Sequence, residues 1–412
     1  MNGIDDRERG SAGEDQGVGM RDLDNLTPLR EVVELIMGQA PPSKDTNFES
    51  QGIPFVKVGE FGLLRPVIRE WTTNPLRMAR TSDVLLCVVG ATCGKINLGE
   101  DCAIGRSVAA IRPNSAKLDQ FYLYYFMMTL VDRLRSRSVG AAQTVISKEM
   151  VESVNIPLLP LPEQQRIVAL LDEAFAGLAT AKANAEQNLQ NARALFESHL
   201  QSVFSQRGEG WDELALSELC DIKHGYAFEG EFFNAEGDYV LLTPGNFYEA
   251  GGFRDRGGKQ KYFTGEIPRD YVLREGDLLV AMTEQAAGLL GSSLLVPESD
   301  KFLHNQRLGL VTARPNVPWS NEFFFHVFNT QHVRREIHAS ASGVKVRHTS
   351  PKKIGDVIVS FPLSLQEQKS LVADFASVSA ETQRLTRLYE RKLAALEELK
   401  KSLLHQAFNG EI

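Results

Sequence analysis

Basic side chains grouped among small polar residues are the part of this sequence best suited to binding a ligand. Four such clusters lie in the chain: Arg65, Arg69, Arg77 and Arg80; Arg133, Arg135 and Arg137; Arg254, Arg256, Lys259 and Lys261; and Arg334, Arg335, Lys345, Arg347, Lys352 and Lys353. Guanidinium and ammonium groups bind phosphate oxygens, and nearby serine, threonine and glutamine side chains reach the edges of bases. One cluster alone is more often a solvated surface. Because clusters recur at corresponding positions in two halves of the chain, contact with DNA is a hypothesis to weigh against a solvated surface.

Six residues in or near these regions are the candidates for direct contact with DNA. They are expected to lie in loops, and they are Arg106, Arg137, Gln143, Arg307, Lys345 and Arg347. Arginine, lysine and glutamine side chains carry the donors and acceptors that read base edges in the major groove. For each of the six, the alternative is a surface charge or a structural salt bridge.

The segment GATCGK (90–95) is similar to a phosphate-binding loop but departs from it at two points. Such a loop has four residues between its glycines and a serine or threonine after its lysine to hold magnesium. Here three residues separate Gly90 from Gly94, and Ile96 follows Lys95. A tight turn between two strands is the better prediction.

Cysteine and histidine do not fall in patterns that bind metals or catalyse reactions. The four cysteines (Cys87, Cys93, Cys102 and Cys220) have no CxxC spacing, and the eight histidines are scattered. The sequence contains no zinc-ligand spacing, no HExxH segment and no Ser/His/Asp arrangement. An Asn-Pro-Pro-aromatic motif for amino-group methylation and a glycine-rich cofactor loop are missing too. The sequence therefore predicts no catalytic residue, metal site or bound cofactor in this chain.

Length and composition limit the class of protein. The 412 residues are enough for two to four domains, and 43 % of them are hydrophobic. A net charge of -8, from 45 basic and 53 acidic side chains, excludes a polybasic protein that coats nucleic acid by charge alone. No apolar run approaches the roughly 18 residues of a membrane span. Cysteines without disulfide spacing and the missing signal-peptide core favour the cytoplasm.

The chain contains an internal repeat. LPEQQRIVALLDE (161–173) matches LQEQKSLVADFAS (365–377), and ALFESHLQSVF (194–204) matches ELKKSLLHQAF (398–408). Both matches have the same offset, so the whole segment between them aligns without a gap. A longer and more divergent region lies upstream of each repeated segment. The order is therefore variable domain, conserved segment, variable domain, conserved segment.

The conserved segments are predicted to be two long helices. Apolar residues recur at steps of three and four from Ile167 to Val203 and from Leu371 to Leu403, which is typical of coiled coils and gives helices of about 60 Å. The first seam is rich in alanine and the second in leucine, so an intramolecular antiparallel pair is favoured. In the expected register Ala174, Ala181 and Ala185 face Leu399, Leu393 and Tyr389. The alternative is two separate helices, each packed on its own domain.

In the variable regions, short β-rich runs alternate with turn residues, which predicts α/β domains. Examples of these runs are residues 53–61, 84–89, 153–159 and 238–243. The predicted fold class is α/β, with two pseudo-repeated domains separated by two long helices that form an intramolecular antiparallel coiled coil. The predicted segments are a disordered leader (1–20), a first α/β domain (21–160), a first long helix (161–207), a second α/β domain (208–363) and a second long helix (364–412).

The chain resembles the specificity subunits of type I restriction–modification enzymes from about residue 26 to its end. The resemblance rests on PLLPLPEQQRIVALLDE (157–173), FPLSLQEQKSLVADF (361–375), LKKSLLHQAFNGEI (399–412), GATCGKINLGEDCAIGRSVAAIRPN (90–114) and, more weakly, NQRLGLVTARPN (305–316). One departure is Ser364, which replaces the second proline of the first copy's PLP. The polar leader, residues 1–20, is a second departure from the family's pattern.

The resemblance implies a division of labour. Each α/β domain would be a target-recognition domain that reads one half of a split, asymmetric site in double-stranded DNA. The helices would set the spacer between half-sites and dock two methyltransferase subunits. Those partners would bind S-adenosylmethionine and methylate adenine. A restriction and translocation subunit, where present, would use ATP and Mg. The rival interpretation is a non-catalytic coiled-coil scaffold that joins two protein-binding domains.

Overall fold

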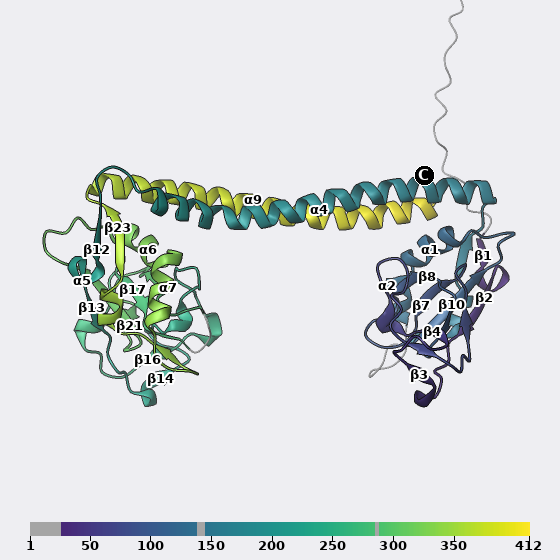
Figure 1. Cartoon of the computed structure of the whole chain (residues 1–412), viewed down its shortest axis with the longest axis horizontal. Coiled ribbons are helices and arrows are strands. Elements are labelled where there is room, and N and C mark those ends of the chain that lie inside the picture. Colours follow the sequence, from purple (N-terminus) through teal and green to yellow (C-terminus); the bar gives the residue numbers. More distant parts are fainter. Residues whose placement is uncertain (1–25, 138–144, 285–287) are drawn as a thin grey trace, which may run out of the picture. The chain divides into compact units, whose positions relative to one another are not determined.

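The computed structural model describes residues 26–137, 145–284 and 288–412, so the predicted leader, residues 1–20, lies outside the described residues. The chain divides into two compact units (Figure 1). Unit 1 comprises residues 1–186 and 391–412, and unit 2 comprises residues 187–390. Each unit holds an α/β domain together with a segment of each long helix.

Two sheets pack in the α/β domain of unit 1. A four-stranded antiparallel sheet has the order β2 (Val33–Met37), β10 (Val108–Pro113), β7 (Val84–Cys87) and β8 (Ile96–Leu98). A mixed sheet has the order β3 (Thr46–Asn47), β5 (Trp71–Thr72), β4 (Ile53–Val56), β9 (Cys102–Ile104) and β6 (Met78–Ala79). The other elements are β1 (Leu26–Pro28), which pairs with β11 (Asn155–Pro157); α1 (Gln120–Thr129), α2 (Val131–Arg137) and α3 (Lys148–Glu152); and 3-10 turns at Leu29–Glu31, Ser43–Asp45 and Val58–Glu60.

Strand β7 shows why this sequence forms the centre of the domain. Its four residues, VLLC, are all buried, because the two faces of the strand pack against different layers. Val84 and Leu86 belong to the core beneath α1, whereas Leu85 belongs to the core shared with the second sheet. Helix α1 begins where the Asp119 side chain accepts the backbone N–H groups of Phe121 and Tyr122.

Unit 2 repeats this plan. Its antiparallel sheet has the order β13 (Cys220–His224), β21 (Leu308–Ala313), β17 (Leu278–Ala281) and β19 (Ser293–Leu295). The second sheet has the order β14 (Phe233–Asn234), β16 (Tyr262–Phe263), β15 (Tyr239–Leu241) and β20 (Phe302–Leu303). Two further strand pairs are β12 (Trp211–Ala215) with β23 (Ile358–Pro362) and β18 (Thr283–Glu284) with β22 (Arg347–His348). The helices of this domain are α5 (Leu216–Leu219), α6 (Asn321–Asn329), α7 (Gln331–Ser340) and α8 (Pro351–Gly355). Short 3-10 turns lie at Gly230–Phe232, Pro244–Asn246, Gly257–Lys259 and Arg269–Tyr271.

The long helices are α4 (Leu161–Gln206, 46 residues) and α9 (Leu365–Phe408, 44 residues). They lie side by side and antiparallel (Figure 1). In unit 1 the Lys182 ammonium contacts the Glu397 carboxylate at 2.6 Å, and in unit 2 the Arg193 guanidinium contacts Glu390 at 2.9 Å. The predicted α/β class and the intramolecular helix pair are confirmed. None of the described helices is long and apolar enough to cross a lipid bilayer.

Two contacts bear on the expected register of this pair. The Lys400 ammonium lies 5.1 Å from the centre of the Phe175 ring in unit 1, and the His199 Nε2 lies 2.8 Å from the Asp374 carboxylate in unit 2. Both contacts lie within two residues of the expected pairing. Leu399, which was expected to face Ala174, is 47 % exposed. The facing of individual seam residues therefore stays a prediction.

One pair of identical residues in the repeat has the same structural role in both units. Gln164 and Gln368 are fully buried near the starts of α4 and α9. The Gln164 Oε1 accepts the Asp119 N–H at 2.8 Å, and its Nε2 donates to the carbonyls of Lys117 and Leu159 at 2.8 and 2.7 Å. Each glutamine thus joins a long helix to the loop before the aromatic helix of its own domain.

The equivalent bonds in unit 2 complete the comparison. The Gln368 Oε1 accepts the Ser320 N–H at 3.0 Å, and its Nε2 donates to the carbonyls of Pro318 at 2.8 Å and Pro362 at 3.0 Å. A buried amide with three satisfied bonds fixes position more strictly than apolar packing does, because each bond depends on direction as well as distance.

The far end of each long helix also packs on an α/β domain. In unit 1, Phe408 of α9 contacts Tyr122 and Phe126 of α1, with ring centroids 5.0 and 5.3 Å apart. In unit 2, the equivalent Phe204 of α4 contacts Phe323 of α6 at 5.7 Å. Each domain therefore packs against the start of one long helix and the end of the other.

Candidate nucleic-acid interface

Each α/β domain has a cleft beside the turn that leads into its six-residue central strand, β10 or β21. The unit 1 cleft has a volume of about 550 Å³ and is lined by Ala40, Pro41, Ser43, Thr46, Phe55, Lys57, Glu70, Val89, Gly105, Arg106 and Ser107. The unit 2 cleft has a volume of about 340 Å³ and is lined by Thr243, Pro244, Gly245, Arg256, Lys261, Thr283, Leu289 and Arg307. The predicted residues Arg106 and Arg307 therefore line one cleft each.

The two turns are built alike. Each is closed by a backbone hydrogen bond of 2.9 Å, from the Val108 N–H to the Gly105 carbonyl in unit 1 and from the Leu308 N–H to the Asn305 carbonyl in unit 2. The arginine carried in each turn is exposed. A short closed turn at the end of a buried strand presents its side chain from a rigid base, which suits selective contact with a ligand.

The two clefts differ in charge. In unit 1 the buried carboxylate of Glu70 forms an ion pair with Lys57, so one of the two cations in the cleft is neutralised. In unit 2 Arg256, Lys261 and Arg307 come together, and none of the described residues that line this cleft is acidic. Three cations with threonine hydroxyls and glycine backbone form a site suited to polyanions.

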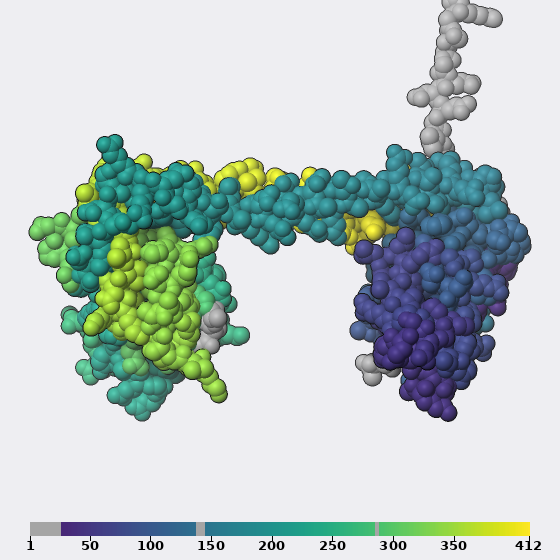
Figure 2. Space-filling view, in the orientation of Figure 1, coloured from purple at the N-terminus to yellow at the C-terminus, as the bar shows by residue number. Residues whose placement is uncertain are grey.

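The predicted residues Lys345 and Arg347 lie at a neighbouring strand. Lys345 is exposed in the turn before β22, and Val344 beside it is 97 % exposed. The yellow-green segments that include this turn form much of the visible face of the unit 2 domain (Figure 2). The pairing of Thr283 with His348 places β22 beside the strand whose Thr283 lines the cleft.

The Arg347 guanidinium already has partners within the chain. It donates to the Nδ1 atom of His338 at 3.0 Å and to the carbonyl of the same residue, and it lies 3.7 Å from the Glu284 carboxylate. The structural salt bridge that the sequence left open as an alternative is present here. A role for Arg347 in contact with DNA stays a prediction.

Two further candidates and several missed residues complete the comparison with the sequence. Arg137 is the last residue of α2, and Gln143 lies outside the described residues. Arg256 and Lys261 line the unit 2 cleft but are not among the six candidates. Both belong to a basic cluster that the sequence shows, and this cluster could have indicated them. Lys57 was missed because its partners in the cleft come from distant loops, which no local pattern shows.

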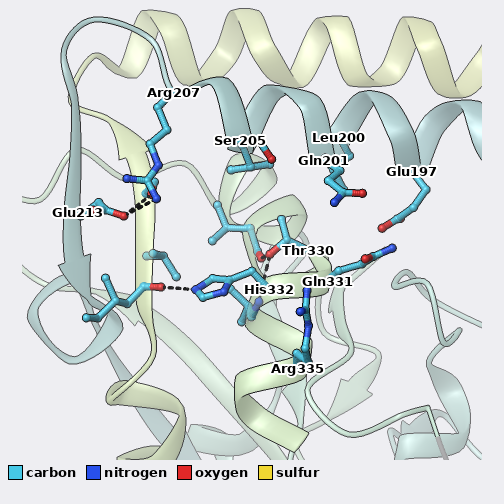
Figure 3. Close-up of a pocket in the computed structure, with 16 residues that line it drawn as sticks. Glu197, Leu200, Gln201, Ser205, Arg207, Glu213, Thr330, Gln331, His332 and Arg335 are labelled. Carbon is cyan, nitrogen blue, oxygen red and sulfur yellow. Dashed lines mark hydrogen bonds and ion pairs between the residues drawn. The ribbon is translucent and has the colours of Figure 1, made fainter. Parts of the chain in front are cut away.

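A third cavity, of about 590 Å³, lies in unit 2 where the end of α4, helix α7 and strand β23 meet. Figure 3 shows its mixed character. The Arg207 guanidinium binds the Glu213 carboxylate at 2.8 Å, and the His332 Nε2 contacts the Ile358 carbonyl at 3.1 Å. Both acidic and basic side chains line this cavity, so it lacks the uniform positive charge of the unit 2 cleft.

The cysteines are placed as core residues. All four are buried and free, and burial raises the pKa of Cys102 and of Cys220 to about 12, so these thiols stay protonated at neutral pH. Within residues 26–137, 145–284 and 288–412, no group of three or more His, Cys, Asp or Glu side chains is placed to hold a metal ion. The GATCGK segment forms the connection between β7 and β8.

Comparison with known proteins adds independent findings. Residues 25–190 match the family model of the type I restriction modification DNA specificity domain. A chain of Methanocaldococcus jannaschii named as the MjaX type I restriction enzyme specificity subunit is 34 % identical over 162 residues, which cover 39 % of this chain and 38 % of that relative. The MjaVIII specificity subunit of the same organism is 22 % identical over 363 residues, covering 82 % of this chain and 81 % of the relative.

Solved structures show the same fold. A chain from a study of assembly and conformational transition of a type I R-M system superposes with a TM-score of 0.74 at 18 % identity, covering 94 % of this chain and 98 % of the other. The HsdS subunit from Thermoanaerobacter tengcongensis superposes with a TM-score of 0.65 at 18 % identity, covering 94 % of this chain and 97 % of that subunit.

Proposed function

Because the chain belongs to the specificity subunits of type I restriction–modification systems, we propose that its two α/β domains each recognise one half of a split, asymmetric DNA sequence. The observation that carries this proposal is the duplicated cleft. Two domains whose antiparallel sheets have the same topology each present an exposed arginine from an equivalent turn, and the clefts behind these turns differ in lining and charge. Equivalent frames with different linings suit recognition of two different half-sites.

The paired helices serve, in this proposal, as the spacer between half-sites. A helix of 46 residues at about 1.5 Å per residue is roughly 69 Å long. This length corresponds to about two turns of duplex at roughly 34 Å per turn. Contacts between the ends of the long helices and the α/β domain of the same unit support this role.

We also propose that the helices dock two methyltransferase subunits, one on each unit. Large apolar side chains that are about 40–47 % exposed support this docking: Leu170 and Leu399 on the unit 1 segments, and Leu195 and Leu388 on the unit 2 segments. Partner subunits would carry S-adenosylmethionine and the methylation of adenine, while this chain supplies recognition. A restriction subunit, where present, would use ATP and Mg.

Single-molecule sequencing of methylated adenines tests the proposed function. The host expresses this chain with its methyltransferase partner, and a matched host lacks the chain. We expect a split motif that vanishes when the chain is deleted. A partner shown to be active that gives no chain-dependent motif would favour the scaffold interpretation instead. Salt-dependent binding of duplex DNA by the complex is the supporting measurement, because contact with phosphates releases counterions.

A further inference from the structure

Helix α2 of unit 1 and the corresponding helix α7 of unit 2 each carry an arginine that binds the loop between the two strands beside the cleft. In unit 1 the Arg135 Nε donates to the Cys93 carbonyl at 2.6 Å, and a terminal nitrogen donates to the Ala91 carbonyl at 3.3 Å. In unit 2 the Arg334 Nε donates to the Leu290 carbonyl at 3.0 Å, and a terminal nitrogen donates to the Gly288 carbonyl. Both arginines therefore hold two carbonyls of the loop that are spaced two residues apart, and Arg334 also donates to the Glu249 carbonyl at 2.8 Å.

We call each arginine with the two loop carbonyls that it binds a clamp. The residue that follows the second of these carbonyls is glycine in both loops. Gly94 and Gly291 have φ angles of +89° and +77°, which glycine adopts without strain. A Cβ atom at Gly94 would lie 2.9 Å from Val131 of α2, and one at Gly291 would lie 2.9 Å from Ile337 of α7. Each loop thus presses directly on the helix that carries its arginine, so the loop and the helix form one rigid piece.

These loops form walls of the two clefts. Leu289, which lies between the Gly288 and Leu290 carbonyls bound by Arg334, lines the unit 2 cleft together with Arg307. Val89, two residues before the first clamped carbonyl of unit 1, lines the unit 1 cleft together with Arg106. Neither Arg135 nor Arg334 is among the described residues that line these two clefts.

In unit 2 a buried carboxylate holds the same loop through its N–H groups. The Glu284 Oε2 accepts the N–H groups of Gly288, Leu289 and Leu290 at 3.0, 3.0 and 2.9 Å, and Glu284 is 3 % exposed. Arg334 binds the carbonyls of the same short segment. The described part of this loop is therefore fixed through both its donors and its acceptors, which leaves little freedom for the wall that Leu289 forms.

We propose that Arg135 and Arg334 are positioning residues for half-site recognition, each of which fixes the loop wall of one cleft without contacting DNA. This inference rests on the proposed function. Lysine cannot replace either residue fully, because a single ammonium does not span two carbonyls as the planar guanidinium does. Loss of one clamp should relax recognition of one half-site and leave the other unchanged.

The test compares Arg334→Gln and Arg135→Gln in the full chain with its methyltransferase partner. Matched controls are Arg335→Gln and Arg133→Gln, which remove the same charge from exposed positions on the same helices. We expect Arg334→Gln to lower the preference for the native half-site of one domain over single-base changes at least tenfold. Arg135→Gln should do the same for the other half-site only. Binding to an unrelated duplex should change less than twofold.

Several outcomes separate the possible roles. Unchanged half-site preference in Arg334→Gln or Arg135→Gln, with normal thermal unfolding, would overturn the inference. Weaker binding to all duplexes with a smaller salt dependence would also overturn it, because that result indicates a direct phosphate contact. If Arg334→Gln fails to fold, Arg334→Lys is measured instead and should give an intermediate loss of preference. A wild-type chain that yields no split motif would refute the proposed function itself rather than the clamp.

Discussion

Replacing Gln368 with leucine tests whether one buried amide holds the second long helix to its α/β domain. The substitution keeps the approximate size of the side chain but removes one acceptor and two donors. It leaves the Ser320 N–H and the carbonyls of Pro318 and Pro362 without their partner. Because Gln368 is fully buried, water does not replace these bonds without opening the contact.

The expected cost follows from these three groups. A buried polar group left without a partner costs about 1–3 kcal/mol. Burying leucine in place of the amide recovers roughly 1–2 kcal/mol. Three such groups together cost about 3–9 kcal/mol, so the free energy of unfolding of unit 2 should fall by about 1–8 kcal/mol. Exposed Gln383 on the same helix provides the control, since its replacement by leucine should change the free energy by less than about 0.5 kcal/mol.

Tryptophan fluorescence during urea unfolding measures this effect where it arises. Two of the three tryptophans lie close to Gln368 in unit 2: the Trp211 Nε1 donates to the neighbouring Glu367 at 2.8 Å, and Trp319 stacks on Phe324 with centroids 3.5 Å apart. The transition should shift to lower urea in Gln368→Leu. If its midpoint matches that of Gln383→Leu, the three hydrogen bonds do not stabilise the contact and the reasoning is refuted.

Three further outcomes follow from the structure. Arg307→Ala should weaken native-site binding by about 1–3 kcal/mol and relax one half-site, measured by binding and by the methylated motif; an unchanged motif would remove Arg307 from the interface. Burial lowers the pKa of His304 and of His326 to about 4, so the folded state resists protonation. Stability should be full above pH about 6.5 and should fall toward pH 4 by about 3 kcal/mol per histidine, measured by urea midpoints; a flat profile would contradict the burial argument. Deleting residues 183–189 together with 390–396 should alter the unread gap in the methylated motif; an unaltered gap would refute the spacer role.

The sequence predicts the long helices and the repeat because both are periodic signals that any alignment of the chain with itself reveals. It does not predict the anchors at Gln164 and Gln368, since the groups that they bind lie in loops about 45 residues away. In the candidate interface, Arg106 and Arg307 were named from the sequence as basic residues expected in loops, and each lines one cleft. Lys57 was not found, because the cleft that it lines is assembled from separate loops.

The basic clusters show a second limit of sequence analysis. Arg135, Arg334 and Arg347 carry the charge expected of residues that contact DNA, yet each binds groups of its own chain. Charge pattern alone does not separate these two roles, because a guanidinium binds backbone carbonyls and phosphate oxygens with the same donors. Only the local backbone geometry decides between them.

The packing of Phe408 on α1 has a consequence for how this protein is made. The core of the first α/β domain includes Leu404, Ala407 and Phe408, which leave the ribosome long after the rest of that domain. While residues of the second domain are still being added during synthesis, the rings of Tyr122 and Phe126 therefore lack their packing partner Phe408. A newly made chain that stops short of residue 404 would keep these rings uncovered, a surface that chaperones and proteases recognise.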